Sequence, residues 1–375
     1  MRDKKTVVII TDNSSRNTSA AIKEVFKEKE GVLTIIIAEN ELEGYFKNTL
    51  FNYLFKEESR LRNYYHKFME LRKTAKMDKL ASKKVSFNIK SPVHRRMQNV
   101  FLRYTPDIVI AMTPKALMAS LAARDKLKSK AKVCVVIDEF CLDKQLVSNQ
   151  TDFYFVDNYD IKDQLVNCGI DENKILISNI PVRKHIRKEM SREEALKVFD
   201  LEDKPTLMVI ASQYGDDKFK KVIGALYEAR LDVNVIVACG YSRRLLAYVR
   251  ERTDFIGLNE GIDINAGYSC ADIVITRPTA TVIGEALYKK KLIFSMYPSG
   301  EMEKRTLEYL GLDIIVKIDN ENQLISKIRE YLDNKDNFEA TRRMAESAVE
   351  GEPVIKITDK LYEFMREDEQ SPRQN

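Results

Sequence analysis

Short apolar runs rich in β-branched residues alternate with amphipathic stretches along almost the whole chain. In the first half they cover residues 7–11, 32–38, 107–112, 133–137 and 153–156. In the second half they cover residues 207–211, 233–238, 272–275 and 292–294. The runs are mostly apolar and do not alternate between apolar and polar residues, which is typical of strands buried on both faces of a parallel sheet. We therefore predict an α/β protein with doubly wound sheets and helices on both faces.

The length of 375 residues favours two domains over one core. A capping box formed by Ser191 and Glu194 opens a new helix after the connection 178–187, and the alternation then restarts. We place an N-terminal domain at 1–182 and a C-terminal domain at 183–354. A final helix and tail, 355–375, would pack back on the first domain.

Positive charge is concentrated in the aromatic-rich segment 44–104. This segment holds 15 Lys and Arg against 4 Asp and Glu, a net charge of +11, and the rest of a chain of net charge +5 therefore carries −6. Such a segment suits an anionic membrane surface, although a pair of solvated helices has the same composition. The residues that we single out for acceptor or membrane contact are Arg60, Arg62, Lys67, Arg72, Lys73, Arg95 and Arg96.

Kinases, simple dehydrogenases and α/β-hydrolases are disfavoured, because their motifs are missing. The chain has no G-x-x-x-x-G-K-[ST] loop, no G-x-G-x-x-G after the first strand and no G-x-S-x-G elbow. The five cysteines and three histidines are scattered without metal-ligand spacing, so we expect no metal site. No recognised nucleic-acid module is present, and no apolar run is long enough to span a bilayer or serve as a signal peptide. We expect a cytoplasmic protein, peripheral on the inner face of the plasma membrane.

The stretch 271–287 reads as a strand, a tight turn at Pro278 and the start of a helix that carries Glu285 near its first turn. The start of a helix attracts anions, because its first amides lack partners and its dipole is positive there. Glu285 is placed to accept hydrogen bonds from a sugar diol. An ordinary βα unit, with an acid that favours the helix start, is the plainer interpretation.

The run TRPTATVIGEAL at 276–287, with YPSGE at 297–301, resembles the donor-binding motifs of monogalactosyldiacylglycerol-synthase-like glycosyltransferases. In that family, which includes bacterial diacylglycerol glucosyltransferases, the pattern is T-K-P-G-G-x-T-x-x-E-A-L followed by P-x-P-G-Q-E. Residues 151–158, 165–170 and 175–183 resemble further family motifs in the same order. The resemblance covers most of the chain and identifies it as a divergent member.

The resemblance implies a GT-B fold, in which two Rossmann-like domains face each other across a cleft. It also implies a UDP-sugar donor held by the second domain, a lipid or other hydrophobic acceptor held by the first, and no cofactor or metal. Glu285 would bind the ribose, and the backbone at 279–281 would hold the diphosphate. The implied donor-binding residues are Ser212, Gln213, Tyr214, Gly215, Leu258, Arg277, Thr279, Ala280, Thr281, Glu285, Gly300 and Glu301.

The chain also departs from the family pattern. Its first loop, 12–21, lacks the family's glycines and histidine, and Thr279 and Ala280 replace a glycine pair. Asp138 and Asp12 remain as carboxylates at strand ends that could act as the general base.

We therefore expect an inverting, metal-independent hexosyltransferase. Two alternatives stay open: a GT-B scaffold that binds a ligand or partner without transferring sugar, and, less favoured with three scattered histidines, a UDP-GlcNAc 2-epimerase-type enzyme.

Overall fold

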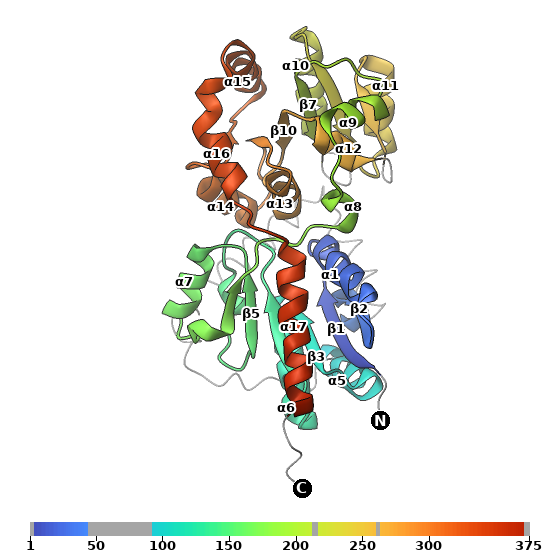
Figure 1. Cartoon of the computed structure of the whole chain (residues 1–375), viewed down its shortest axis with the longest axis vertical. Helices are drawn as coiled ribbons and strands as arrows, with labels where there is room; N and C mark the ends of the chain where they lie inside the picture. The colour runs from blue at the N-terminus through green and yellow to red at the C-terminus, as the bar shows by residue number, and fades with distance from the viewer. Residues whose placement is uncertain (1–3, 44–91, 212–216, 260–262, 371–375) are drawn as a thin grey trace. The chain divides into compact units, whose positions relative to one another are not determined.

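The computed structural model describes residues 4–43, 92–211, 217–259 and 263–370. The chain divides into two compact units (Figure 1). Unit 1 comprises Met1–Ile137, Leu142–Ile177 and Ile357–Asn375, and unit 2 comprises Asp138–Cys141 and Ser178–Lys356. The chain passes into unit 2 at Ser178, five residues before the expected boundary.

The earlier boundary has a packing reason. Ile180 and Val182 are 3% and 1% exposed and belong to a hydrophobic core of unit 2. The connection that we expected to lie between domains is therefore part of the second one.

The sheet of unit 1 has six parallel strands in the order β2-β1-β3-β4-β5-β6. The strands are β1 (Lys5–Thr11), β2 (Val32–Ala38), β3 (Ile108–Ala111), β4 (Lys132–Val136), β5 (Phe153–Val156) and β6 (Ile175–Ile177). The helices are α1 (Arg16–Glu28), α2 (Glu39–Glu43), α5 (Pro92–Tyr104), α6 (Pro114–Leu127), α7 (Tyr159–Asn167) and the last helix, α17 (Pro353–Gln370), with 3₁₀ turns η2 (Lys144–Leu146) and η3 (Glu172–Lys174).

From Ile357 onward α17 packs in unit 1. Its Phe364 ring meets the ring of Phe153 on β5 edge-on at 5.2 Å, and Asp359 pairs with Lys29 at 2.5 Å. Neighbouring residues on β5 alternate between the two faces, since Tyr154 lies in a different cluster, with residues of α5 and α6. Both faces of this sheet are therefore covered.

The sheet of unit 2 is also parallel, in the order β12-β11-β10-β7-β8-β9. Its strands are β7 (Thr206–Ile210), β8 (Asn234–Ala238), β9 (Ile256–Leu258), β10 (Ile273–Thr276), β11 (Leu292–Ser295) and β12 (Val316–Lys317). Its helices are α8 (Lys184–Arg187), α9 (Arg192–Val198), α10 (Asp217–Glu228), α11 (Arg243–Arg252), α12 (Ile264–Cys270), α13 (Ala280–Tyr288), α14 (Glu301–Leu310), α15 (Glu321–Asp333) and α16 (Glu339–Ser347), with the 3₁₀ turn η4 (Lys335–Phe338).

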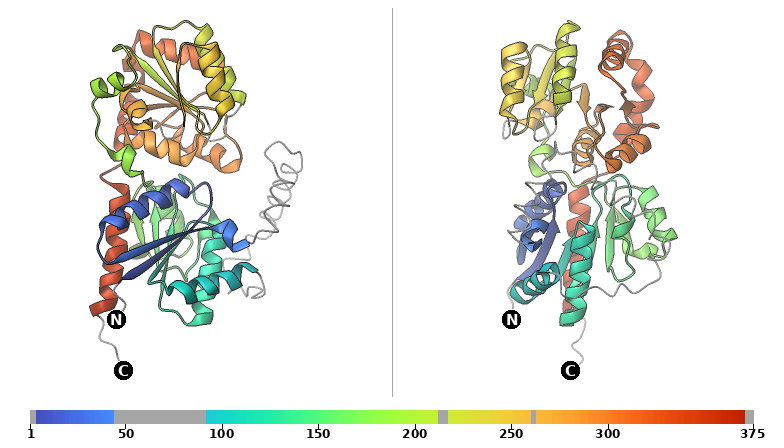
Figure 2. Two further views of the ribbon diagram at one scale, coloured as in Figure 1. Left: turned by 90° about the vertical axis from the view of Figure 1, so that its right-hand side faces the viewer. Right: turned by 180° about the vertical axis from the view of Figure 1, so that it is seen from behind.

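Helices cover both faces of this sheet (Figure 2). The buried side chains form one hydrophobic cluster on each face. On β7, Leu207 and Val209 pack with α10, α11 and α15, whereas Met208 and Ile210 pack with α12, α13 and α14. Burying each such side chain contributes about 1.5–3 kcal/mol, so a strand covered on both faces is apolar throughout. The two sheets confirm the predicted doubly wound, Rossmann-like GT-B architecture.

Candidate functional site

In unit 2 the strand order reverses between β7 and β10, which pair directly although β8 and β9 separate them along the chain. Ligands of doubly wound sheets bind outside the carboxyl ends of the strands at such a reversal. The last residues of the two strands lie opposite each other, and the hydroxyl of Thr276 donates to the carbonyl oxygen of Ile210 at 3.2 Å. The turn that carries the predicted donor-binding residues therefore leaves the sheet at its topological switch point.

This turn leads into a helix start whose first amides carry no intrahelical bond. The first amide of α13 that bonds back is that of Ile283, to the carbonyl of Thr279 at 3.0 Å. Thr279 is the N-cap residue, but its side chain makes no capping hydrogen bond. Its own amide donates to the carbonyl of Arg277 at 2.7 Å. Of the predicted stretch 279–281, only the amides of Ala280 and Thr281 thus face the open end of the helix dipole.

Glu285 is the sixth residue of α13, a turn deeper than we expected, and only 3% of its surface is exposed. Its Oε1 lies 3.1 Å from Nη2 of Arg183 and accepts a hydrogen bond from Nε of the same residue at 3.2 Å. Its Oε2 accepts a hydrogen bond from the hydroxyl of Tyr268 at 3.2 Å. The carboxylate is therefore held inside unit 2 by partners from α12 and from the residue before α8.

Burial controls the protonation of this cluster. Loss of water raises the pKa of Glu285 above its ordinary value of 4.5, and the charge of Arg183 and the hydrogen bonds oppose that rise without cancelling it. Burial, with the adjacent carboxylate, also raises the pKa of Tyr268 well above 10. The hydroxyl of Tyr268 therefore stays protonated throughout the physiological pH range and donates its hydrogen bond to Glu285.

Sequence reasoning missed Glu303, the third residue of α14. Its carboxylate accepts from Nη2 and Nε of Arg277 at 3.0–3.3 Å, from the hydroxyl of Thr279 at 3.3 Å and from the amide of Ser299 at 2.6 Å. The available signal was an acid in the first turn of a helix that follows a glycine. The charge of Arg277, one of the expected donor-binding residues, is thus neutralised by a neighbour.

The loop between β11 and α14 is shaped by left-handed backbone at two positions. Tyr297 has φ +57°, and Gly300, the N-cap of α14, has φ +87°. The value at Gly300 favours glycine, whose missing side chain permits it. Glu301, which follows, is exposed at the first position of the helix.

Two further parts of the predicted donor set lie elsewhere. Leu258 ends β9, is 4% exposed and packs in a small core with Ala266 and Cys270. Its side chain is therefore a core element, and any ligand contact there would use backbone. Ser212, Gln213, Tyr214 and Gly215 lie outside the described residues.

The two candidate bases differ in their surroundings. Asp12, at the end of β1, accepts from the amides of Ser14 and Ser15 at 3.0 Å each and from the hydroxyl of Ser14 at 2.7 Å. These are the bonds of a side chain that caps the loop before α1. Asp138 is 7% exposed and groups with unit 2 through the segment 138–141, whose Phe140 lies in a core of that unit.

Two of the predicted acceptor or membrane residues are described. On α5, Arg95 is exposed, and Arg96 donates to the carbonyl of Glu41 at 3.2 Å. Leu102, two turns along the same helix, is 63% exposed. Arg60, Arg62, Lys67, Arg72 and Lys73 lie outside the described residues. Every helix in the described part of the chain is too short or too polar to span a bilayer.

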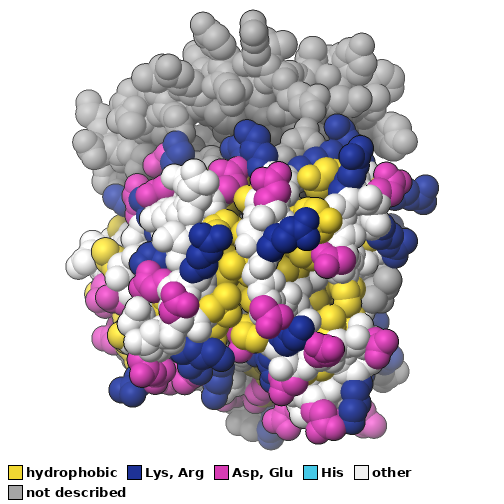
Figure 3. All heavy atoms as spheres, turned by 90° about the horizontal axis from the view of Figure 1, so that it is seen from above, with side chains coloured by type: hydrophobic (Ala, Val, Ile, Leu, Met, Phe, Trp, Pro, Cys, Tyr) yellow, Lys and Arg dark blue, Asp and Glu magenta, His cyan; other side chains and the backbone are white. Residues whose placement is uncertain are grey.

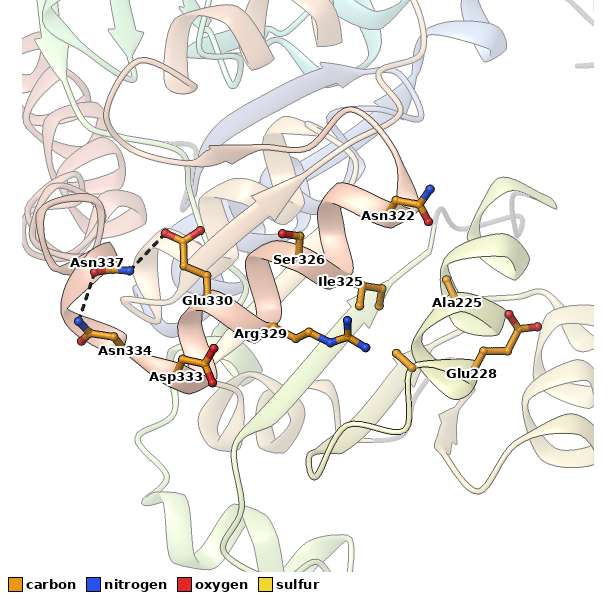
Figure 4. A pocket seen from close by; sticks show the side chains of 11 residues that line it. Ala225, Glu228, Asn322, Ile325, Ser326, Arg329, Glu330, Asp333, Asn334 and Asn337 are labelled. Atoms are coloured by element: carbon orange, nitrogen blue, oxygen red, sulfur yellow. Dashed lines mark hydrogen bonds between the residues drawn. The ribbon is translucent and has the colours of Figure 1, made fainter.

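Two hollows on unit 2 are lined by described residues outside α13. One of about 790 Å³ lies between α10 and α15 and is lined mostly by amide and charged side chains. Among them, Asn337 is hydrogen-bonded to Glu330 and Asn334 (Figure 4). A second, of about 330 Å³, adjoins Tyr297 and Lys304. Of the predicted donor-binding residues, the eight that the structure describes are absent from the linings of both hollows. The face in Figure 3 mixes Lys and Arg with Asp and Glu and shows no patch of a single sign.

Comparisons with known proteins agree with this architecture. Residues 16–182 match the family model described as monogalactosyldiacylglycerol (MGDG) synthase. The processive diacylglycerol beta-glucosyltransferase of Staphylococcus epidermidis is 21% identical over 352 residues, which cover 91% of this chain and 83% of that protein.

Two solved structures share the fold. MurG of Acinetobacter baumannii is 12% identical with a TM-score of 0.61, covering 96% of this chain and 99% of its own. HepE of Anabaena, solved with UDP and glucose, is 13% identical with a TM-score of 0.55 and covers 96% and 99%.

Proposed function

We propose that this chain is a divergent member of the family of monogalactosyldiacylglycerol synthases and diacylglycerol glycosyltransferases, and that it moves a hexose from a UDP-sugar to a diacylglycerol-type lipid. The lipid acceptor follows the names of the relatives. The nucleotide donor follows HepE, whose structure holds UDP. We further propose that the transfer inverts the anomeric centre and uses neither metal nor cofactor.

The observation that carries the proposal is the start of α13 at the switch point of unit 2. The amides of Ala280 and Thr281 have no intrahelical acceptor, and the N-cap side chain does not cover them. A diphosphate placed there would accept their hydrogen bonds and meet the positive end of the dipole. The same contacts would stabilise the UDP that leaves when the sugar is transferred.

Glu285 is our candidate for the ribose contact, but both of its carboxylate oxygens already have partners. Two nitrogens of Arg183 contact Oε1, and the hydroxyl of Tyr268 donates to Oε2. A ribose hydroxyl would have to replace one of these donors, and Arg183, with 26% of its side chain exposed, is the one that water already reaches. We propose that Arg183 yields Oε1 to the ribose when the donor binds.

Asp138 is our candidate base. In the proposed step its carboxylate takes the proton of the acceptor hydroxyl, the hydroxyl oxygen forms a bond to the anomeric carbon, and the bond to the diphosphate breaks on the opposite side with its electron pair. Asp12 is the weaker candidate, because three hydrogen bonds from Ser14 and Ser15 to its Oδ1 hold the carboxylate in the loop before α1.

We propose that the protein works at an anionic membrane surface on the inner face of the plasma membrane. Among the described residues, the support is the exposed face of α5, where Arg95 and Arg103 flank the exposed Leu102. Arginine beside an exposed leucine suits lipid headgroups next to acyl chains.

Transfer from UDP-hexoses to diacylglycerol in vesicles tests the proposal. Purified protein with UDP-glucose or UDP-galactose, diacylglycerol vesicles and EDTA should release UDP and form a glycolipid of inverted anomeric configuration, read by mass spectrometry and NMR. Asp138→Asn should lower kcat by about 10²–10⁴-fold. The matched control is Asp171→Asn, which changes an exposed carboxylate that caps η3. Glycolipid formation that is absent with every UDP-hexose, in protein shown to be folded, would overturn the proposal.

A further inference from the structure

Glu303 joins two loops that leave neighbouring strands of unit 2. One is the loop after β10, which supplies Arg277 and Thr279, and the other is the loop after β11, which supplies the amide of Ser299. Both strands end at the same edge of the sheet, where Thr276 pairs with Ser295. A single carboxylate thus fixes the turn before α13 against the turn before α14.

The contact with Thr279 changes what that N-cap does. The Thr, Ser, Asn and Asp N-caps of α6, α7, α9, α11, α12 and α15 each accept a hydrogen bond from an amide of their own helix. The hydroxyl of Thr279 instead donates to Oε1 of Glu303 and accepts nothing from α13. Its own helix therefore keeps its leading amides open.

The contact with Arg277 has a second effect. The guanidinium and the carboxylate have 16% and 19% of their side chains exposed, and the pair shares three hydrogen bonds at 3.0–3.3 Å. A bidentate pair of this kind has a fixed geometry. Arg277 is therefore an anchor of the turn, and the anion attraction at this edge comes from the amides of α13.

We propose that Glu303 is a positioning residue for the donor: by holding the hydroxyl of Thr279 away from α13 and locking Arg277, it keeps the helix start open and aligned for the diphosphate. This inference rests on the proposed function. Glu303 itself touches no substrate. Its loss releases the Thr279 hydroxyl, which then caps α13 as other N-caps do and competes with the phosphate oxygens.

Calorimetric titration with UDP tests the inference, with Glu303→Ala, Glu303→Gln and the double variant Thr279→Val/Glu303→Ala. Glu303→Ala should raise the Kd for UDP about tenfold, the scale of one helix-capping hydrogen bond that the diphosphate would have to displace. Glu303→Gln keeps an oxygen acceptor and should recover part of the affinity. The double variant should bind UDP more tightly than Glu303→Ala, because its N-cap has no hydroxyl to compete. A purely structural role for Glu303 would make the second substitution neutral or harmful.

Turnover separates the roles further. Glu303→Ala should raise the KM for the UDP-sugar while the KM for the lipid and kcat change less than threefold. Glu308→Gln, an exposed acid on the same helix, is the matched control, and thermal unfolding verifies that each variant is folded. If Glu303→Ala binds UDP as tightly as the wild type or more tightly, the inference is wrong. If the wild type binds no UDP, the proposed function itself fails.

Discussion

Replacing Arg183 by Met leaves the buried carboxylate of Glu285 with one hydroxyl as its partner. The substitution keeps an apolar stem of similar length and removes the guanidinium that contacts Oε1 at 3.1–3.2 Å. Because Glu285 is 3% exposed, water cannot replace the lost donor. We expect the variant to lose stability because it keeps an uncompensated charge, a larger effect than the loss of one contact.

The size of this loss has an upper limit, since the carboxyl can take up a proton instead of staying charged. From its ordinary pKa of 4.5, neutralising Glu285 at pH 7 costs at most about 3.4 kcal/mol. Breaking a buried pair costs about 3–5 kcal/mol, and the 26% exposure of Arg183 reduces that figure. We therefore expect a loss of about 2–3 kcal/mol at pH 7. At pH 5 the same limit falls to about 0.7 kcal/mol.

The sign of the pH dependence follows from the direction of the shift. Burial raises the pKa of Glu285 in the folded protein, so the folded state binds more protons than the unfolded state between pH 4.5 and the raised pKa. The contribution of Glu285 to stability is therefore greatest below pH 4.5 and falls as the pH rises through the raised pKa. Removing Arg183 raises the pKa of Glu285 further and widens the pH range over which the folded state binds more protons than the unfolded state.

Thermal unfolding at pH 5 and pH 7.5 measures the effect. Arg183→Met should lower the Tm of unit 2 by about 5–10 °C at pH 7.5 and by less than about 3 °C at pH 5. Arg183→Met/Glu285→Gln should regain most of the loss. The matched control is Arg187→Met, whose partner Glu352 is 44% exposed, and it should cost less than about 1 kcal/mol at both pH values. Equal losses for Arg183→Met at the two pH values would refute the reasoning.

Three further predictions concern local packing and chemistry. Gly284→Ala should cost about 1–3 kcal/mol in thermal unfolding, because its Cβ would lie 3.1 Å from two carbons of Ile180; an unchanged Tm would show that Ile180 moves aside. Asp12→Ala should cost about 1 kcal/mol through the loss of three hydrogen bonds from Ser14 and Ser15, and a cost near zero would exclude a capping role. Ellman's reagent should label one thiol rapidly in the native protein, since Cys168 is exposed and the other four cysteines are buried. Burial also raises the pKa of Cys239 and Cys270 to about 11, so their thiols are unreactive. Rapid labelling of several thiols would contradict this prediction.

The sequence predicts the strands of this protein well. The bounds of β5 are those expected from its apolar run, because a strand buried on both faces must be apolar along its length. The edge strand β2 also has the expected bounds, although most of its residues are only half-buried. The helix α12 was not expected, since Ile264–Cys270 is short and contains a glycine. The usable signal was Asp263, whose side chain caps the helix through the amide of Ala266.

The surroundings of the candidate site could not be predicted in the same way. The pattern places Glu285 on the helix after β10, but its partner Arg183 lies 102 residues earlier in the chain, and nothing local indicates that the two meet. The same holds for Glu303, whose contacts with Arg277 and Thr279 depend on β10 and β11 being neighbours in the sheet. Spacing in the sequence identifies residue types near a switch point, whereas tertiary packing decides which of them remain available to a ligand.

The most direct test of the account compares the binding of UDP with that of uridine by calorimetry. If the start of α13 holds the diphosphate, UDP should bind at least about 100-fold more tightly than uridine, since two or more charge-assisted hydrogen bonds separate the two ligands. The difference should shrink on replacing Thr281 by Pro, which removes one of the two open amides of the predicted stretch. Equal affinities for UDP and uridine, or no binding of UDP to folded protein, would contradict the assignment of the donor site to this helix.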